Sequence, residues 1–152
     1  MSPTVEDLRR RFAPIPEVWV ATRDADGAPH VVPRWFVWRE DGLWVACDRD
    51  ARTWANAEAD PRVAIAGDVG TAWGDLAGFS LRGAAELLRA EDARMRGPIS
   101  AWHEKYRNLL LGEGFERLTG AVERLGFLRV EVGEVRAWDH AGPALPLRGA
   151  GD

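Results

Sequence analysis

Residues 17–48 read "EVWVATRDADGAPHVVPRWFVWREDGLWVACD" and contain three runs rich in valine and tryptophan. Asp26-Gly27 separates the first run from the second, and Asp41-Gly42 separates the second from the third. Glycine after aspartate supplies the positive φ that tight hairpin turns require. The stretch therefore predicts three consecutive antiparallel strands joined by hairpins, and this prediction decides the fold.

Helical periodicity predicts three helices outside this stretch: one between Thr4 and Pro14, one over residues 50–59, and one over much of residues 90–125. Thr4 and Asp7 have the spacing of a capping box at the start of the first helix. Asp50 is the expected cap of the second helix. The third is expected to break near Gly97-Pro98 and again around residues 112–114.

Three more apolar runs predict strands over residues 62–68, 76–88 and 126–139. Six strands joined largely without crossover helices favour an antiparallel sheet, and closure into a small barrel protects its edges. We therefore predict a mainly β fold, a six-stranded antiparallel split barrel with Greek-key-like connections and helices packed outside. A parallel nucleotide-binding sheet is disfavoured because hairpins join the first strands. Residues 1–139 are expected to form one domain, and residues 140–152 a mobile tail.

Composition narrows the classes of function. The chain has 152 residues, a net charge of −4 and one cysteine. An acidic balance disfavours sequence-independent binding to nucleic acid. One cysteine excludes an internal disulfide and a cysteine cage for zinc. With neither a long apolar run nor a leader-like N-terminus, the protein is expected to be cytoplasmic and not membrane-bound.

The sequence contains no recognisable catalytic side chain. The sequence contains no dinucleotide fingerprint, P-loop, zinc-protease motif or serine-nucleophile motif. The three histidines have no ligand spacing, so no metal site is predicted, and Cys47 is interpreted as a small buried hydrophobe. If the protein is an enzyme, a bound cofactor is expected to carry the reaction.

One local feature points to an anion. A predicted strand ends at Cys47-Asp48 and a helix begins near Asp50, which places Arg52 and Thr53 in its first turn. Backbone N–H groups, the helix dipole and a guanidinium together suit a phosphate. An ordinary solvated surface arginine is the alternative, and the local sequence alone leaves both open.

The order of these elements resembles the flavin-binding split-barrel superfamily, which contains pyridoxamine 5′-phosphate oxidases and deazaflavin-dependent reductases. The matching pieces are "DGAPHVVPRWF", "GLWVACD", "RTWANAEADPR", "LRGAAELL" and "LRVEVGEVRAWDH", so the likeness covers nearly the whole chain. Residues 90–125 match it only loosely. The resemblance implies a homodimer that holds FMN or the deazaflavin coenzyme F-420 at the subunit interface.

The resemblance also implies which residues surround the cofactor. Its ring is expected beside Val31, Val32, Pro33, Arg34 and Trp35, with Ala46 and Cys47 opposite and Gly78 and Phe79 on the fifth strand. The phosphate of such cofactors meets a Ser-Arg-Lys run, where this chain has Ala51-Arg52-Thr53. Arg52 and Thr53 are therefore expected at the phosphate, and Arg34 or Arg49 is expected to replace the missing lysine.

The implied function is a flavin- or deazaflavin-dependent oxidoreductase acting on a small organic substrate. The basic residues required for pyridoxamine phosphate oxidation itself are not identifiable. Residues 90–115 and the Trp73 loop are expected to set substrate specificity, although plain packing of Tyr106, Leu109 and Leu110 on the barrel is the alternative. Two other functions stay open: a flavin- or haem-storing protein without turnover, and a split-barrel dimer without a cofactor.

Overall fold

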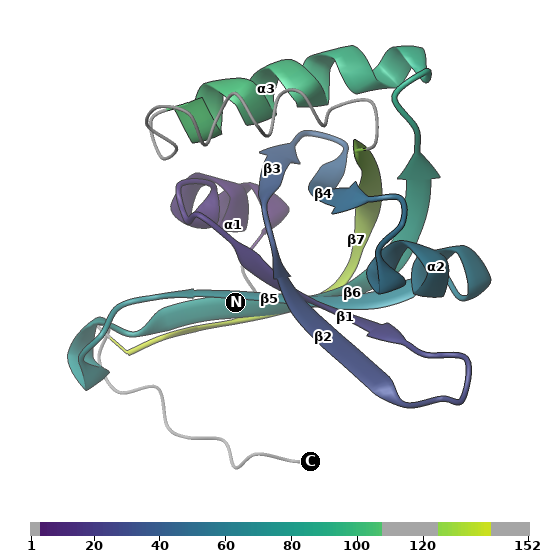
Figure 1. Cartoon of the computed structure of the whole chain (residues 1–152). Helices are drawn as coiled ribbons and strands as arrows, with labels where there is room; N and C mark the ends of the chain where they lie inside the picture. The colour runs from purple at the N-terminus through teal and green to yellow at the C-terminus, as the bar shows by residue number, and fades with distance from the viewer. Residues whose placement is uncertain (1–3, 108–124, 141–152) are drawn as a thin grey trace.

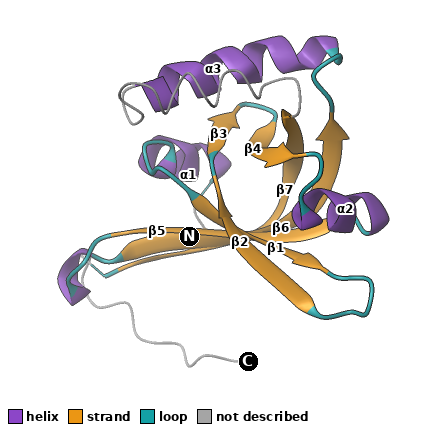
Figure 2. Ribbon diagram, in the orientation of Figure 1, coloured by secondary structure: helices purple, strands orange, loops and turns teal. Residues whose placement is uncertain are grey.

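The computed structural model describes residues 4–107 and 125–140, and its elements form one curled antiparallel sheet with helices around it (Figures 1 and 2). The strands are β1 (Val18–Arg23), β2 (Pro29–Arg34), β3 (Phe36–Arg39), β4 (Gly42–Asp48), β5 (Arg62–Val69), β6 (Ala77–Leu88) and β7 (Leu125–Asp139). The helices are α1 (Val5–Phe12), α2 (Arg52–Ala59) and α3 (Arg96–Arg107), with single 3-10 turns η1 (Trp73–Asp75) and η2 (Ala93–Met95). Within the described residues, no helix is long and apolar enough to cross a membrane.

The sheet order explains the curl. It runs β2-β1-β5-β6-β7-β4-β3, with every neighbouring pair antiparallel. β2 and β3 stand at opposite ends of that order, yet only Trp35 separates them in the sequence. The two ends of the sheet must therefore come together, which they do by curling around a common interior (Figure 1).

The predicted run of three antiparallel strands joined by hairpins is confirmed with one change. β1 pairs with β2 and β3 pairs with β4, each across its Asp-Gly turn, where Gly27 has φ +89° and Gly42 has φ +137°. The second predicted strand breaks at Trp35 into β2 and β3, so the described sheet has seven strands where six were predicted. The antiparallel sheet class, the mainly β fold and the outer position of the helices are as predicted.

Two helix predictions need correction. The capping box at Thr4 and Asp7 is present, but Asp50 does not cap α2, whose N-cap is Ala51 with no side-chain hydrogen bond. Asp50 instead donates its backbone N–H to the Asp48 carboxylate at 3.0 Å. Gly97 lies in the first turn of α3 and does not break it, because the first turn tolerates the proline that follows. The expected break at 112–114, the helix beyond residue 107 and the tail beyond residue 140 lie outside the described residues.

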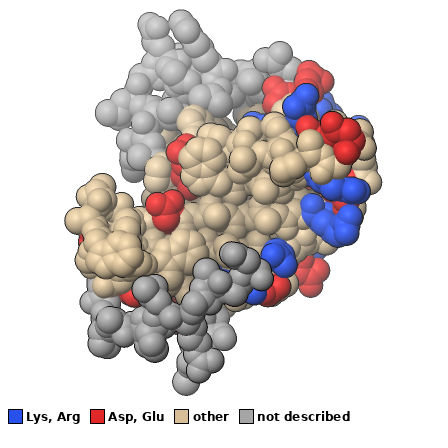
Figure 3. All heavy atoms as spheres, turned by 90° about the horizontal axis from the view of Figure 1, so that it is seen from below, with Lys and Arg blue, Asp and Glu red and all other residues tan. Residues whose placement is uncertain are grey.

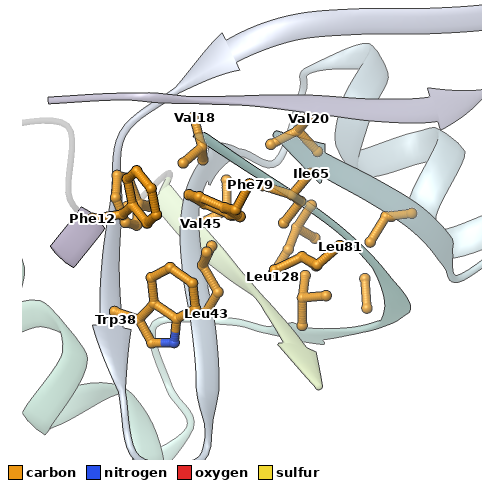
Figure 4. Close-up of a cluster of buried hydrophobic side chains, with 14 of the residues drawn as sticks. Phe12, Val18, Val20, Trp38, Leu43, Val45, Ile65, Phe79, Leu81 and Leu128 are labelled. Atoms are coloured by element: carbon orange, nitrogen blue, oxygen red, sulfur yellow. The ribbon is translucent and has the colours of Figure 1, made fainter. Parts of the chain in front are cut away.

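The core has two parts, one on each face of the β3–β4 hairpin. Larger side chains from α1 and the strands fill the inside of the curl (Figure 4): they include Phe12, Val18, Val20, Trp38, Leu43, Val45, Ile65, Phe79, Leu81 and Leu128. The second part lies between the hairpin and α3 and consists of Val37, Trp44, Leu88, Met95, Trp102, Tyr106 and Phe127. Strand alternation accounts for the division, since Val37 and Trp38 point to opposite faces.

Tyr106 holds α3 against the point where the sheet closes. Its hydroxyl accepts a hydrogen bond from the backbone N–H of Phe36 at 2.8 Å and lies 2.7 Å from the carbonyl oxygen of Pro16. The Tyr106 ring stacks on Trp35, with centroids 5.0 Å apart and an interplanar angle of 17°. Lys105 donates to the Phe36 carbonyl oxygen at 3.0 Å. Tyr106 is thus a packing residue, which agrees with the alternative prediction that it packs on the barrel.

Tyr106→Phe should destabilise the fold by about 1–3 kcal/mol, because it leaves the buried Phe36 N–H without this acceptor while keeping the aromatic ring. Denaturant unfolding followed by tryptophan fluorescence measures the change. A loss below about 0.5 kcal/mol would show that the hydroxyl is not needed for closure.

Candidate functional site

The strongest candidate site lies where β2 ends beside the start of α2. Arg34, the last residue of β2, donates from Nη2 to the hydroxyl oxygen of Thr53 at 3.0 Å. Thr53 is completely buried, and the Nε of Arg34 is buried with no hydrogen-bond partner among the described residues. A guanidinium with an unsatisfied buried donor is suited to receive an acceptor from a ligand.

The start of α2 adds further donors to this corner. No side chain caps its N-terminus, so the first-turn N–H groups rely on other acceptors. The Asp48 carboxylate, which could have opposed an anion at this corner, accepts a hydrogen bond from the Asp50 backbone N–H. The residues present therefore fit a phosphate: a guanidinium, a hydroxyl and an uncapped helix start converge here.

Arg52 points elsewhere in this structure. Its side chain is 66% exposed, and its Nη1 lies 3.5 Å from Oδ2 of Asp24 in the β1–β2 turn. The same aspartate accepts from the Asn56 side chain at 2.7 Å, and Asn56 also donates to the Thr22 hydroxyl at 3.0 Å. Asp24 therefore draws Arg52 toward the turn, whereas Arg34 occupies the inner position beside Thr53.

The other predicted basic residue is also apart from this corner. Arg49 lies 4.0 Å from Glu91 and lines a separate groove with Trp54, Glu58 and Arg89. Of the two arginines expected to replace the missing lysine, Arg34 is the one that contacts Thr53.

Cys47 has a structural environment. It is 1% exposed, and its thiol lies 3.4 Å from the Asp48 carbonyl oxygen. Burial raises the pKa of the Cys47 thiol, while the nearby Arg34 acts in the opposite direction. A raised pKa keeps the thiol protonated at neutral pH, so it is not a nucleophile. Ala46 points to the opposite face and packs with the α3 side of the core.

The remaining predicted ring contacts fall into two groups. Val31 and Pro33 are exposed on one face of β2, while Val32 and Arg34 are half-buried on the other, and Trp35 stacks against Tyr106. These five residues are consecutive and accessible. Phe79 is not, because its ring is completely buried between Phe12 and Trp38, with centroids 4.9 and 5.2 Å away. Its neighbour Gly78 lies directly beneath the Trp138 ring.

The residues that the sequence did not single out are Thr22, Asp24 and Asn56. They tie α2 to β1 and to the β1–β2 turn through contacts that span more than 30 positions of sequence. The available sequence signal was Asn56, an asparagine within the alanine-rich helix α2. A buried side-chain amide requires hydrogen-bond partners, so its presence there indicates contacts with another element.

A profile of the pyridoxamine 5′-phosphate oxidase family matches residues 5–139. The chain belongs to that family. The matched region contains every described strand and both halves of the candidate site. A comparison with curated protein sequences finds no significant match.

Solved structures with the same fold are distant in sequence. A conserved hypothetical protein from Mycobacterium tuberculosis is 20% identical, with a TM-score of 0.77 over 97% of this chain and 94% of that one. The heme storage protein HutZ from Vibrio cholerae is 18% identical, with a TM-score of 0.70 over 91% and 96%. An F420 reductase is 17% identical, with a TM-score of 0.60 over 82% and 92%.

Thr53→Val should destabilise the protein by about 1–3 kcal/mol, because it removes the acceptor of Arg34 at nearly constant volume. Thr71→Val, at an exposed position, is the matched control and should change stability by less than about 0.5 kcal/mol. Thermal and denaturant unfolding measure both. Equal effects would mean that the Arg34–Thr53 contact contributes nothing.

Proposed function

We propose that this protein is a flavin- or deazaflavin-dependent oxidoreductase that binds the phosphate of FMN or of coenzyme F-420 between the end of β2 and the start of α2. The observation that carries this proposal is the Arg34–Thr53 contact, with the buried Nε of Arg34 left available. Family membership and the named F420 reductase among its structural neighbours support it.

The cofactor, when bound, supplies hydride or electron transfer to a small organic substrate. The chain's own part is binding and orientation. Arg34 and Thr53 hold phosphate oxygens, with the uncapped start of α2 beside them. Val32 lies on the same face of β2 as Arg34 and is the apolar residue expected beside the cofactor ring.

A haem-binding or haem-storing protein is the second candidate. Similarity to HutZ and to a heme binding protein from Mycobacterium smegmatis favours it. The serine and lysine missing from the phosphate run, at Ala51 and Thr53, favour it as well. The absorption spectrum after reconstitution separates the two candidates, since haem gives a Soret band and flavin does not.

We further propose that the protein acts as a homodimer with the cofactor at the subunit interface. The outer face of β2, β1 and β5 carries Trp19, 45% exposed, opposite Pro33, and Val31, 57% exposed, opposite Ala21. Figure 3 views the molecule from this side, and the middle of the surface carries no charged side chains. An exposed, uncharged sheet face of this kind is typical of an interface between copies.

Arg34→Gln should weaken FMN binding by roughly tenfold to a hundredfold, because a charged hydrogen bond to phosphate is lost. Riboflavin has the same ring without the phosphate, so its affinity should stay the same. Flavin fluorescence titration measures both ligands, and coenzyme F-420 is titrated in the same way.

Two comparisons sharpen this experiment. Thr53→Val removes the hydroxyl that holds Arg34 and should also weaken FMN binding, and Arg52→Ala measures whether the outer arginine turns toward the ligand. Arg136→Gln, on the distant end of β7, is the control. If Arg34→Gln weakens riboflavin as much as FMN, the arginine does not bind the phosphate.

Val31→Glu should shift the protein from dimer to monomer, because it places a charge in the centre of the proposed interface. Analytical ultracentrifugation gives the assembly state. Val5→Glu introduces the same charge at an exposed valine on α1 and should leave the dimer intact. A native chain that sediments as a monomer at about 100 μM would refute the interface.

A further inference from the structure

A second ligand-sized groove lies away from the proposed cofactor site. It has a volume of about 700 Å³ and runs between α1, the β3–β4 hairpin and the start of α3. Its lining includes Arg9, Trp38, Arg39, Trp44, Arg94 and Pro98, and none of the residues of the Arg34–Thr53 corner. A volume of this size is typical of small-molecule sites.

Trp38 leaves a buried donor at this groove. The residue is 9% exposed, and its indole N–H has no hydrogen-bond partner among the described residues. Figure 4 shows the nitrogen on the side of the ring that faces away from Phe79 and Val45, so core packing does not supply an acceptor. Trp44, on the same groove, differs because it donates to Asp41 at 2.9 Å.

The charges around the groove leave Arg39 available. Arg9 lies 2.8 Å from Glu6, and Arg94 lies 2.8 Å from both Glu86 and Asp92. Within residues 4–107 and 125–140, no ion pair involves Arg39.

The Arg39 guanidinium reaches the start of α3, where a Cβ added to Gly97 would lie 3.0 Å from its Nη2. The glycine thus leaves room for the cation at the groove. Two carboxylates also line the groove: Asp41 lies 3.8 Å from Arg129, which offsets its charge, and Glu40 is exposed to water, which screens its charge.

We propose that this groove binds a small organic carboxylate, whose oxygens accept from the Arg39 guanidinium and the Trp38 indole N–H. The guanidinium recognises the carboxylate as a pair of oxygens. Pro98 and the exposed edge of Trp38 supply the apolar part of the lining, whereas the Trp44 ring is buried on the α3 side of the hairpin. Because Trp38 Nε1 is covered in the free protein, a small movement of the ring accompanies binding.

The experiment titrates the purified chain with para-fluorobenzoate and follows the ligand by fluorine NMR. The native protein should show saturable binding with a Kd of about 1 mM or tighter. Arg39→Gln should weaken binding by roughly tenfold, and Trp38→Phe by roughly fivefold, because each removes a donor. para-Fluorobenzyl alcohol, which has no charge, should bind more weakly than the carboxylate.

Two variants assign the signal to this groove. Arg34→Gln and Arg136→Gln should leave the titration unchanged, which separates the groove from the proposed cofactor site and from general surface charge. Circular dichroism checks folding, and Arg39→Gln, which alters no core packing, keeps the test valid if Trp38→Phe is unstable. Absence of saturation up to about 20 mM, or an unchanged Kd in Arg39→Gln, would overturn the proposal.

Discussion

The closure of the sheet at Trp35 is the constraint on which the rest of the structure depends. One extended run pairs with β1 through its first half and with β4 through its second half, so the chain itself joins the two ends of the sheet. The Ala46 N–H donates to the Trp35 carbonyl oxygen at 2.9 Å, which continues the pairing with β4 up to the break. The Tyr106 hydroxyl then bonds the backbone N–H and carbonyl oxygen of Phe36, the first residue of β3. At an open sheet edge, these backbone groups would be exposed to solvent or to another chain.

The candidate site is a consequence of that closure. Arg34 ends the strand on one side of the break, and α2 follows β4 on the other side, so closing the sheet brings the guanidinium to Thr53. Nineteen positions separate the two residues in sequence. The same closure places Trp35 against Tyr106 of α3. The Arg34–Thr53 contact and the contact between α3 and the sheet therefore flank the same break in the strand.

Local sequence signals predicted the elements well, because hairpin turns and strand runs depend on neighbouring residues. The two Asp-Gly turns and the strands at 62–68, 76–88 and 126–139 appear close to their expected positions. The break at Trp35 was not predicted in this way: Pro33 lies two residues before it, but a strand at the end of a sheet, such as β2, tolerates a proline without breaking.

Side-chain directions at the candidate site could not be predicted from the sequence, because long-range contacts set them. Arg52 has the family position for a phosphate ligand, but Asp24 on a distant turn draws it outward. Phe79 lies on β6, but its ring points into the core and fills the space between α1 and Trp38. Arg34 could be placed on a list of candidates from the sequence, whereas its contact with Thr53 required the fold.

Hydrogen-bond donors that are buried without a partner connect this fold with its proposed function. The described residues contain three such atoms, in Arg34, Trp38 and Trp102. Each costs about 1–3 kcal/mol, a sizeable share of the roughly 5–15 kcal/mol that stabilises a domain. Trp102 borders a largely apolar cavity of only about 10 Å³, too small for a ligand, so its donor is a plain cost of packing. Arg34 and Trp38 border the two proposed sites, where an acceptor on the bound ligand would recover the lost hydrogen bond. In both proposals the stability lost at these positions returns as binding energy, which a fully satisfied core would not have available.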